Sequence, residues 1–148
     1  MLQIYALVVA VNIIMGIIIM FDRVRGEGFS GDGSFIHNNT FTLTLSIFAG
    51  IIAVSSLMSP YGEPVNGVGS FAMLPIIGDL FPAMATLMGF FVFLARYLKT
   101  NYPEIYADNG FFLFIENSEF YIGIFCLIMA TLHFFFPTLL LIWDIQVS

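Results

Sequence analysis

Four long apolar segments limit what this chain can fold into. They run over Leu2–Phe21, Phe41–Met58, Ile76–Leu98 and Phe120–Ile142. The hydrocarbon core of a bilayer is about 30 Å thick, and about 20 helical residues cross it. Inside that core the backbone must satisfy its own hydrogen bonds, which long apolar segments do as helices. The segments therefore predict four transmembrane helices.

The composition agrees with a membrane location. Of the 148 residues, 59% are hydrophobic and only 9% are charged, and the mean hydropathy is +0.97. Soluble domains carry about 25% charged residues, and one of this size leaves about a third of its unfolded surface in water. We therefore expect an all-α integral membrane protein, with one transmembrane domain over residues 1–148.

The basic residues predict how the helices are oriented. Arg23 and Arg25 follow the first segment, and Arg96 and Lys99 close the third. Since basic residues gather on the cytoplasmic side, both of these connections should lie in the cytoplasm and both termini outside. The first segment lacks the basic region and cleavage site of a signal peptide, so it should be a retained helix. We expect a bacterial cytoplasmic (inner) membrane.

A short phrase occurs twice in the chain. FIHNNTF at Phe35–Phe41 and FIENSEF at Phe114–Phe120 share the pattern F-I-x-N-x-x-F, and each comes before an apolar segment. A similar offset relates Arg23 to Arg96 before the phrases and Pro60 to Pro137 after them: 73 positions for the arginines, 79 for the phrases and 77 for the prolines. Chance matches are common in a chain rich in Phe and Ile. The alternative is duplication of a helical hairpin, with halves 1–60 and 74–142 in the same orientation. We expect a pseudo-symmetric four-helix bundle made of these tandem hairpins.

The repeated phrase is interpreted as a helix start. Its polar residues, Asn38–Thr40 and Asn117–Glu119, directly precede the second and fourth apolar segments. Asn, Ser and Thr side chains accept hydrogen bonds from the N–H groups of a first helical turn. The stretch Gly110–Ile115, just before the second copy, is expected to lie in the headgroup region, with a docking surface as the alternative.

Small residues predict the faces on which the helices meet, because they let backbones approach closely in lipid. The second segment offers four, the third two and the fourth three, while those of the first are less regularly spaced. In chain order they are Ala6, Ala10, Gly16, Ala49, Gly50, Ala53, Ser56, Ala85, Gly89, Gly123, Cys126 and Ala130.

Polar residues within apolar segments are candidate functional sites, because burying them in hydrocarbon is costly. The candidates of this kind are Asn12, Asp79 and His133. Pro82 and Pro137 are helix-breaking and leave backbone carbonyls without an N–H donor; for Pro137 that carbonyl belongs to His133. The three polar residues are interpreted either as the lining of an outward-facing polar site or as structural groups. Asp79 would then cap a helix, His133 would bond a nearby carbonyl, and Asn12 would join two helices.

Several functional classes find no support in the sequence. The net charge of −6 argues against nucleic acid as a partner. There is no catalytic or phosphate-binding motif, and with Cys126, His37 and His133 as the only cysteine and histidines we expect no metal and no cofactor. The expected function is therefore that of a structural or accessory subunit, not an enzyme, bound to lipid and to itself or other membrane subunits. The alternative is an oligomeric channel or small transporter using Asn12, Asp79 and His133.

Overall fold

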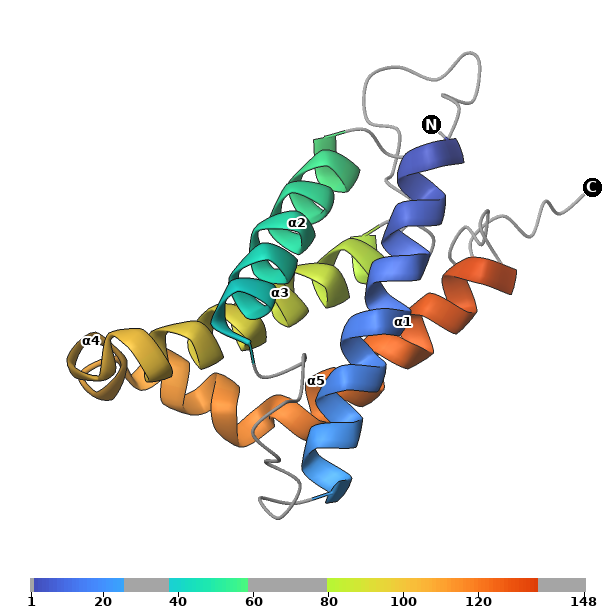
Figure 1. The fold of residues 1–148 in the computed structure, drawn as a ribbon. Helices are drawn as coiled ribbons and strands as arrows, with labels where there is room; N and C mark the ends of the chain where they lie inside the picture. The colour runs from blue at the N-terminus through green and yellow to red at the C-terminus, as the bar shows by residue number, and fades with distance from the viewer. Residues whose placement is uncertain (1, 26–37, 59–79, 136–148) are drawn as a thin grey trace, which may run out of the picture.

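The computed structural model describes residues 2–25, 38–58 and 80–135, and these residues are almost entirely helical (Figure 1). Within these ranges the helices are α1 (Leu2–Arg25), α2 (Asn39–Met58), α3 (Phe81–Asn101), the short α4 (Pro103–Ala107) and α5 (Gly110–Phe135). Four of them, all but α4, are long and apolar enough to cross a membrane. The predicted all-α class is thus confirmed for the described residues, as is the presence of four helices long and apolar enough to span a membrane.

Long-range contacts establish the direction of each spanning helix. Asn12 and Asp22 of α1 contact Pro82 and Arg96 of α3 in the same order along both helices, so α1 and α3 run in parallel. Asn39 at the start of α2 contacts Asn101 at the end of α3, so α2 runs in the opposite direction. The start of α1 lies beside the end of α5, where Tyr5 contacts the His133 carbonyl, so α5 is also antiparallel to α1.

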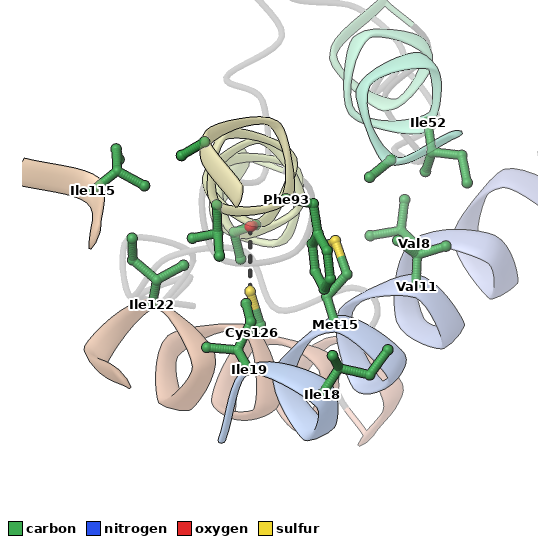
Figure 2. Packing of buried hydrophobic residues seen from close by; sticks show 14 of the residues in the cluster. Val8, Val11, Met15, Ile18, Ile19, Ile52, Phe93, Ile115, Ile122 and Cys126 are labelled. Carbon is green, nitrogen blue, oxygen red and sulfur yellow. Dashed lines mark hydrogen bonds between the residues drawn. The ribbon is translucent and has the colours of Figure 1, made fainter. Parts of the chain in front are cut away.

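Helices that follow one another in the chain are not always the closest pairs. The largest contacts join α1 to α5 and α2 to α3, while α1 and α2 touch much less. The core lies where α1, α3 and α5 converge, and Figure 2 shows Met15, Ile19, Phe93 and Cys126 pointing into that space. Met15, Phe93 and Ile19 are fully buried there.

The predicted start of the fourth spanning helix is wrong. We expected Phe120, but α5 begins at Gly110, where the Asn109 side chain accepts a hydrogen bond from the Phe111 N–H at 3.0 Å. The second phrase therefore lies inside α5 and does not cap it. The first phrase does cap α2, since Asn38 Oδ1 accepts from the Thr40 N–H at 2.8 Å. The residues beyond position 135, including Pro137, lie outside the described ranges.

The third spanning helix also differs from the prediction at its start. The structure begins α3 at Phe81, and residues 76–79 lie outside the described ranges. Pro82 occupies the first turn of α3, directly after Phe81 and Leu80, and Leu80 also has helical backbone angles. The residues that a break at Pro82 would affect lie before position 80, outside the described ranges, so the helix-breaking role stays a prediction.

Most of the predicted small-residue faces are buried. Ala49, Ala53 and Ser56 of α2 lie inside the bundle, as do the following residues of α3 and α5: Ala85, Gly89, Gly123, Cys126 and Ala130. Helix α1 differs, because Gly16 is buried while Ala6 and Ala10 are exposed. Those two alanines lie on a face that no other described helix covers.

Candidate functional site

A cavity of about 370 Å³, lined by both charged and apolar side chains, lies at one end of the bundle. All four spanning helices and α4 contribute to its wall. Its lining residues are Asp22, Asn39, Thr42, Val92, Ala95, Arg96, Lys99, Thr100, Tyr106, Ile115, Glu116 and Glu119. We call this region the charged end of the bundle. Neither the cavity nor its acidic residues were among the sites predicted from the sequence.

Arg96 is at the centre of the charged end. Its Nη1 atom lies 2.5 Å from Asp22 Oδ2, and its Nε atom lies 2.5 Å from Glu119 Oε1. The three side chains are only 17–24% exposed. A guanidinium group has rigidly placed N–H donors that can bind two carboxylates at once. Because Asp22 belongs to α1 and Glu119 to α5, Arg96 of α3 links these two helices.

A second ion pair is more exposed to solvent. Lys99 Nζ lies 2.5 Å from Glu116 Oε1, with side-chain exposures of 58% and 40%. Tyr106 of α4 donates its hydroxyl to the other oxygen of Glu116. Burial, together with the neighbouring carboxylates Glu116 and Glu119, raises the pKa of Tyr106, so this hydroxyl keeps its proton and remains a donor at neutral pH.

These contacts give the predicted orientation residues a structural role. Arg96 and Lys99 lie at the charged end together with Asp22, the last residue of the α1 span. The side chains of Arg23 and Arg25 lie outside the described residues, although both belong to α1. The spacing of Glu116 and Glu119, three residues apart in a helix, was the available sequence signal for a shared acidic face.

Asn12 makes a buried contact between α1 and α3. The side chain is completely buried, and its Nδ2 atom donates to the Pro82 carbonyl at 3.1 Å. The Thr86 hydroxyl donates to the same carbonyl at 2.9 Å. Within the described ranges, Asn12 Oδ1 has no hydrogen-bond partner. Asn12 therefore joins two helices, as one of its two interpretations predicted, and keeps one acceptor available.

His133 lies in a separate contact between α5 and α1. Its backbone carbonyl accepts a hydrogen bond from the Tyr5 hydroxyl at 2.5 Å, and the two rings lie 4.5 Å apart between centroids. The histidine is 3% exposed. Tyr5 was not predicted as a partner, and a tyrosine near the start of an apolar segment gives no signal of such a contact.

The site formed by Asn12, Asp79 and His133 together stays a prediction. Asn12 contacts α3 and His133 contacts Tyr5, while Asp79 and His37 lie outside the described ranges. Cys126 is buried and its thiol donates to the Ala85 carbonyl at 3.3 Å, which fits a small interface residue (Figure 2). Across residues 2–25, 38–58 and 80–135, no three His, Cys, Asp or Glu side chains are placed to hold a metal ion.

Comparison with other proteins adds a relative. An uncharacterised protein of Treponema pallidum (strain Nichols) is 32% identical to this chain over 142 residues, which cover 95% of the chain and 100% of the relative. The chain belongs to the same family as this protein. A family profile that carries no functional description matches residues 1–133. No solved structure shows significant similarity.

The profile match covers α1 to α4 and α5 up to residue 133. The name of the relative states no activity, ligand or partner. Any functional proposal must come from the geometry of this chain.

Proposed function

We propose that this protein is a structural or accessory subunit of a homo- or hetero-oligomeric membrane assembly. The observation that carries the proposal is the outward face of α1. On this face Ala6, Ala10, Ile13 and Ile17 follow one another at spacings of four, three and four residues, and all are exposed. That spacing forms one continuous stripe along a helix.

The small residues distinguish this stripe from an ordinary lipid-facing surface. Helices associate in lipid through small residues that let the backbones approach, and Ala6-xxx-Ala10 is such a pair. The exposed face of α2, in contrast, presents the bulky side chains of Ile47, Ile51 and Val54. Only 22% of the α5 span is buried within the chain, so further apolar surface is also available to a partner.

Replacing Ala10 with leucine is expected to weaken or abolish association of the purified protein. A larger side chain on the small-residue stripe keeps an approaching helix at a distance, which removes its packing contacts. Native mass determination after extraction in mild detergent measures the association directly. Wild type is expected to form a defined oligomer or to copurify with a defined membrane partner.

Val54→Leu is the matched control. Like Ala10, Val54 is an exposed apolar residue, 52% exposed on α2, and this change also enlarges an apolar side chain. This variant should keep the wild-type assembly. A wild-type protein that is a stable monomer without a partner would contradict the proposal. If that monomer also conducts ions or solutes in vesicles, and Asn12→Leu abolishes the flux, the alternative of a channel or small transporter is favoured. The free acceptor of Asn12 is the observation that supports this alternative.

We also propose that the bundle is a parallel repeat of two hairpins, α1–α2 and α3–α5, in a bacterial cytoplasmic (inner) membrane with both termini outside. If the two hairpins are exchanged, α1 takes the place of α3, and α2 takes the place of α5. The contact between α1 and α5 then becomes the contact between α3 and α2, and these two contacts are the largest in the bundle. The parallel course of α1 and α3 fits the same operation. The position of Arg96 and Lys99 beside the end of α1 supports a common cytoplasmic side.

Labelling of engineered cysteines tests this orientation. Thr100→Cys, at the exposed end of α3, is expected to react with a membrane-impermeant maleimide only after the cells are opened. Ser148→Cys is expected to react with intact cells. The native Cys126 is 0% exposed and should add little background. The reverse pattern would show that the termini are cytoplasmic.

A further inference from the structure

The cavity at the charged end lies where three of the candidate membrane spans begin or end. Asp22 is the last residue of the α1 span and Asn39 is the first of the α2 span, and both line the cavity. Lys99 and Thr100 come from the last turn of α3. Since the ends of spanning helices lie where hydrocarbon meets the headgroups, we expect the cavity near headgroup depth.

The cavity has a buried floor and an exposed rim. Thr42, Val92, Ala95 and Ile115 are buried and form a largely apolar floor, whereas Asn39, Lys99 and Thr100 on the rim are exposed. Its volume of about 370 Å³ lies within the range of small-molecule sites, roughly 300–1,000 Å³. A ligand that is polar at one end and apolar at the other fits a cavity with an exposed polar rim and a buried, largely apolar floor.

The charges of the residues that line the cavity indicate which kind of ligand it favours. Two basic residues, Arg96 and Lys99, come from α3, and three acidic residues come from other helices: Asp22 of α1 and Glu116 and Glu119 of α5. Two positive minus three negative groups leave a formal charge of −1, which disfavours an anionic headgroup. A simple cation bound at the carboxylates would lie close to Arg96 and Lys99, which would repel it. A ligand that carries both signs can place its phosphate toward α3 and its ammonium group toward the carboxylates.

We propose that this cavity binds the phosphate–ammonium headgroup of a zwitterionic phospholipid. The Lys99–Glu116 pair is the exchangeable part of the site. Ion pairs as exposed as this one contribute little to stability, so Lys99 can turn to the phosphate. Glu116 Oε1 can then accept from the ammonium group while Oε2 keeps its hydrogen bond from Tyr106. Arg96 stays between Asp22 and Glu119 and keeps the helices in place. The site is independent of the α1 face proposed for assembly, because no residue of that face lines the cavity.

The test uses the full chain in nanodiscs that contain equal amounts of phosphatidylethanolamine and phosphatidylglycerol. Native mass spectrometry of the released protein identifies the lipid that stays bound. Wild type is expected to retain phosphatidylethanolamine in preference. Lys99→Gln and Glu116→Gln should each reduce its retention about tenfold, as the loss of one charge-assisted hydrogen bond predicts. Thr42→Leu, which fills the floor and removes no charge, should also reduce it.

Glu104→Gln is the matched control, since Glu104 is exposed on α4 and does not line the cavity. It should retain phosphatidylethanolamine as wild type does. Free phosphoethanolamine that displaces the lipid would show that the headgroup alone is recognised; no displacement would show that recognition includes the lipid's apolar part. Equal retention of both lipids, or equal effects of Glu104→Gln and Glu116→Gln, would overturn the proposal. Melting temperatures close to wild type ensure that each variant is folded.

Discussion

Replacing Gly16 with alanine is expected to destabilise the bundle by about 1–3 kcal/mol, the usual cost of overpacking a well-packed core. A Cβ atom at position 16 would lie 2.7 Å from Leu127 Cγ and 2.9 Å from the Gly123 backbone oxygen. Neither atom is the flexible end of a side chain, so α1 and α5 would have to move apart. The midpoint of thermal unfolding in mild detergent measures the effect.

Two other glycines provide graded controls for the same substitution. Gly110→Ala places its methyl group where nothing lies within 4 Å, so stability should be unchanged or slightly higher. At Gly89 the new Cβ would meet Met15 Cε at 2.6 Å and Sδ at 2.7 Å. Methionine is unbranched and adapts to small changes, so Gly89→Ala should cost less than Gly16→Ala. Equal melting temperatures for Gly16→Ala and Gly110→Ala would show that α1 and α5 are not in close contact at Gly16.

Replacing Arg96 with methionine is expected to lower the free energy of unfolding by about 2–3 kcal/mol. The change leaves Asp22 and Glu119 without the cation that lies 2.5 Å from each of them. Breaking a fully buried ion pair by removing one partner costs about 3–5 kcal/mol, and the partial exposure of these side chains reduces that value. Thermal or denaturant unfolding in detergent measures the loss.

Lys99→Met is the matched control, because it also removes a cation from α3 but breaks a pair that is much more exposed. Its expected cost is about 0–1 kcal/mol. A triple variant in which Arg96→Met is combined with Asp22→Asn and Glu119→Gln should recover part of the lost stability, since no charge is then left without a partner. If Arg96→Met and Lys99→Met were equally stable, Arg96 would not tie α1 to α5.

The charged residues of α5 show why its start could not be predicted from the sequence. Glu116 and Glu119 lower the local hydropathy, so a window along the chain begins the helix after them. In the folded protein these carboxylates contact Lys99 and Arg96 of α3, which removes much of the cost of placing them in a spanning helix. The Asn109 cap then allows α5 to begin at Gly110.

Some residues of the candidate sites could be predicted from the sequence, and others could not. Asn12 and His133 were identified because a polar residue within an apolar segment is visible in the sequence, and both are buried in helix–helix contacts. Tyr5 and Asp22 carry no such signal, and the spacing of Glu116 and Glu119 indicated only a shared acidic face. Their importance depends on neighbours that are remote in the chain: Tyr5 contacts a residue 128 positions away, and Asp22 one 74 positions away.

The sequence by itself determined that the chain has four apolar helices and which of their small residues are available for packing. Hydropathy, helix length and residue size are local properties, so reading along the chain is sufficient for them. The tertiary structure decided that α1 pairs with α5, that Ala6 and Ala10 stay exposed, and that five charged side chains surround one cavity. Those features depend on distances between residues of different helices, and helix packing alone brings such residues together.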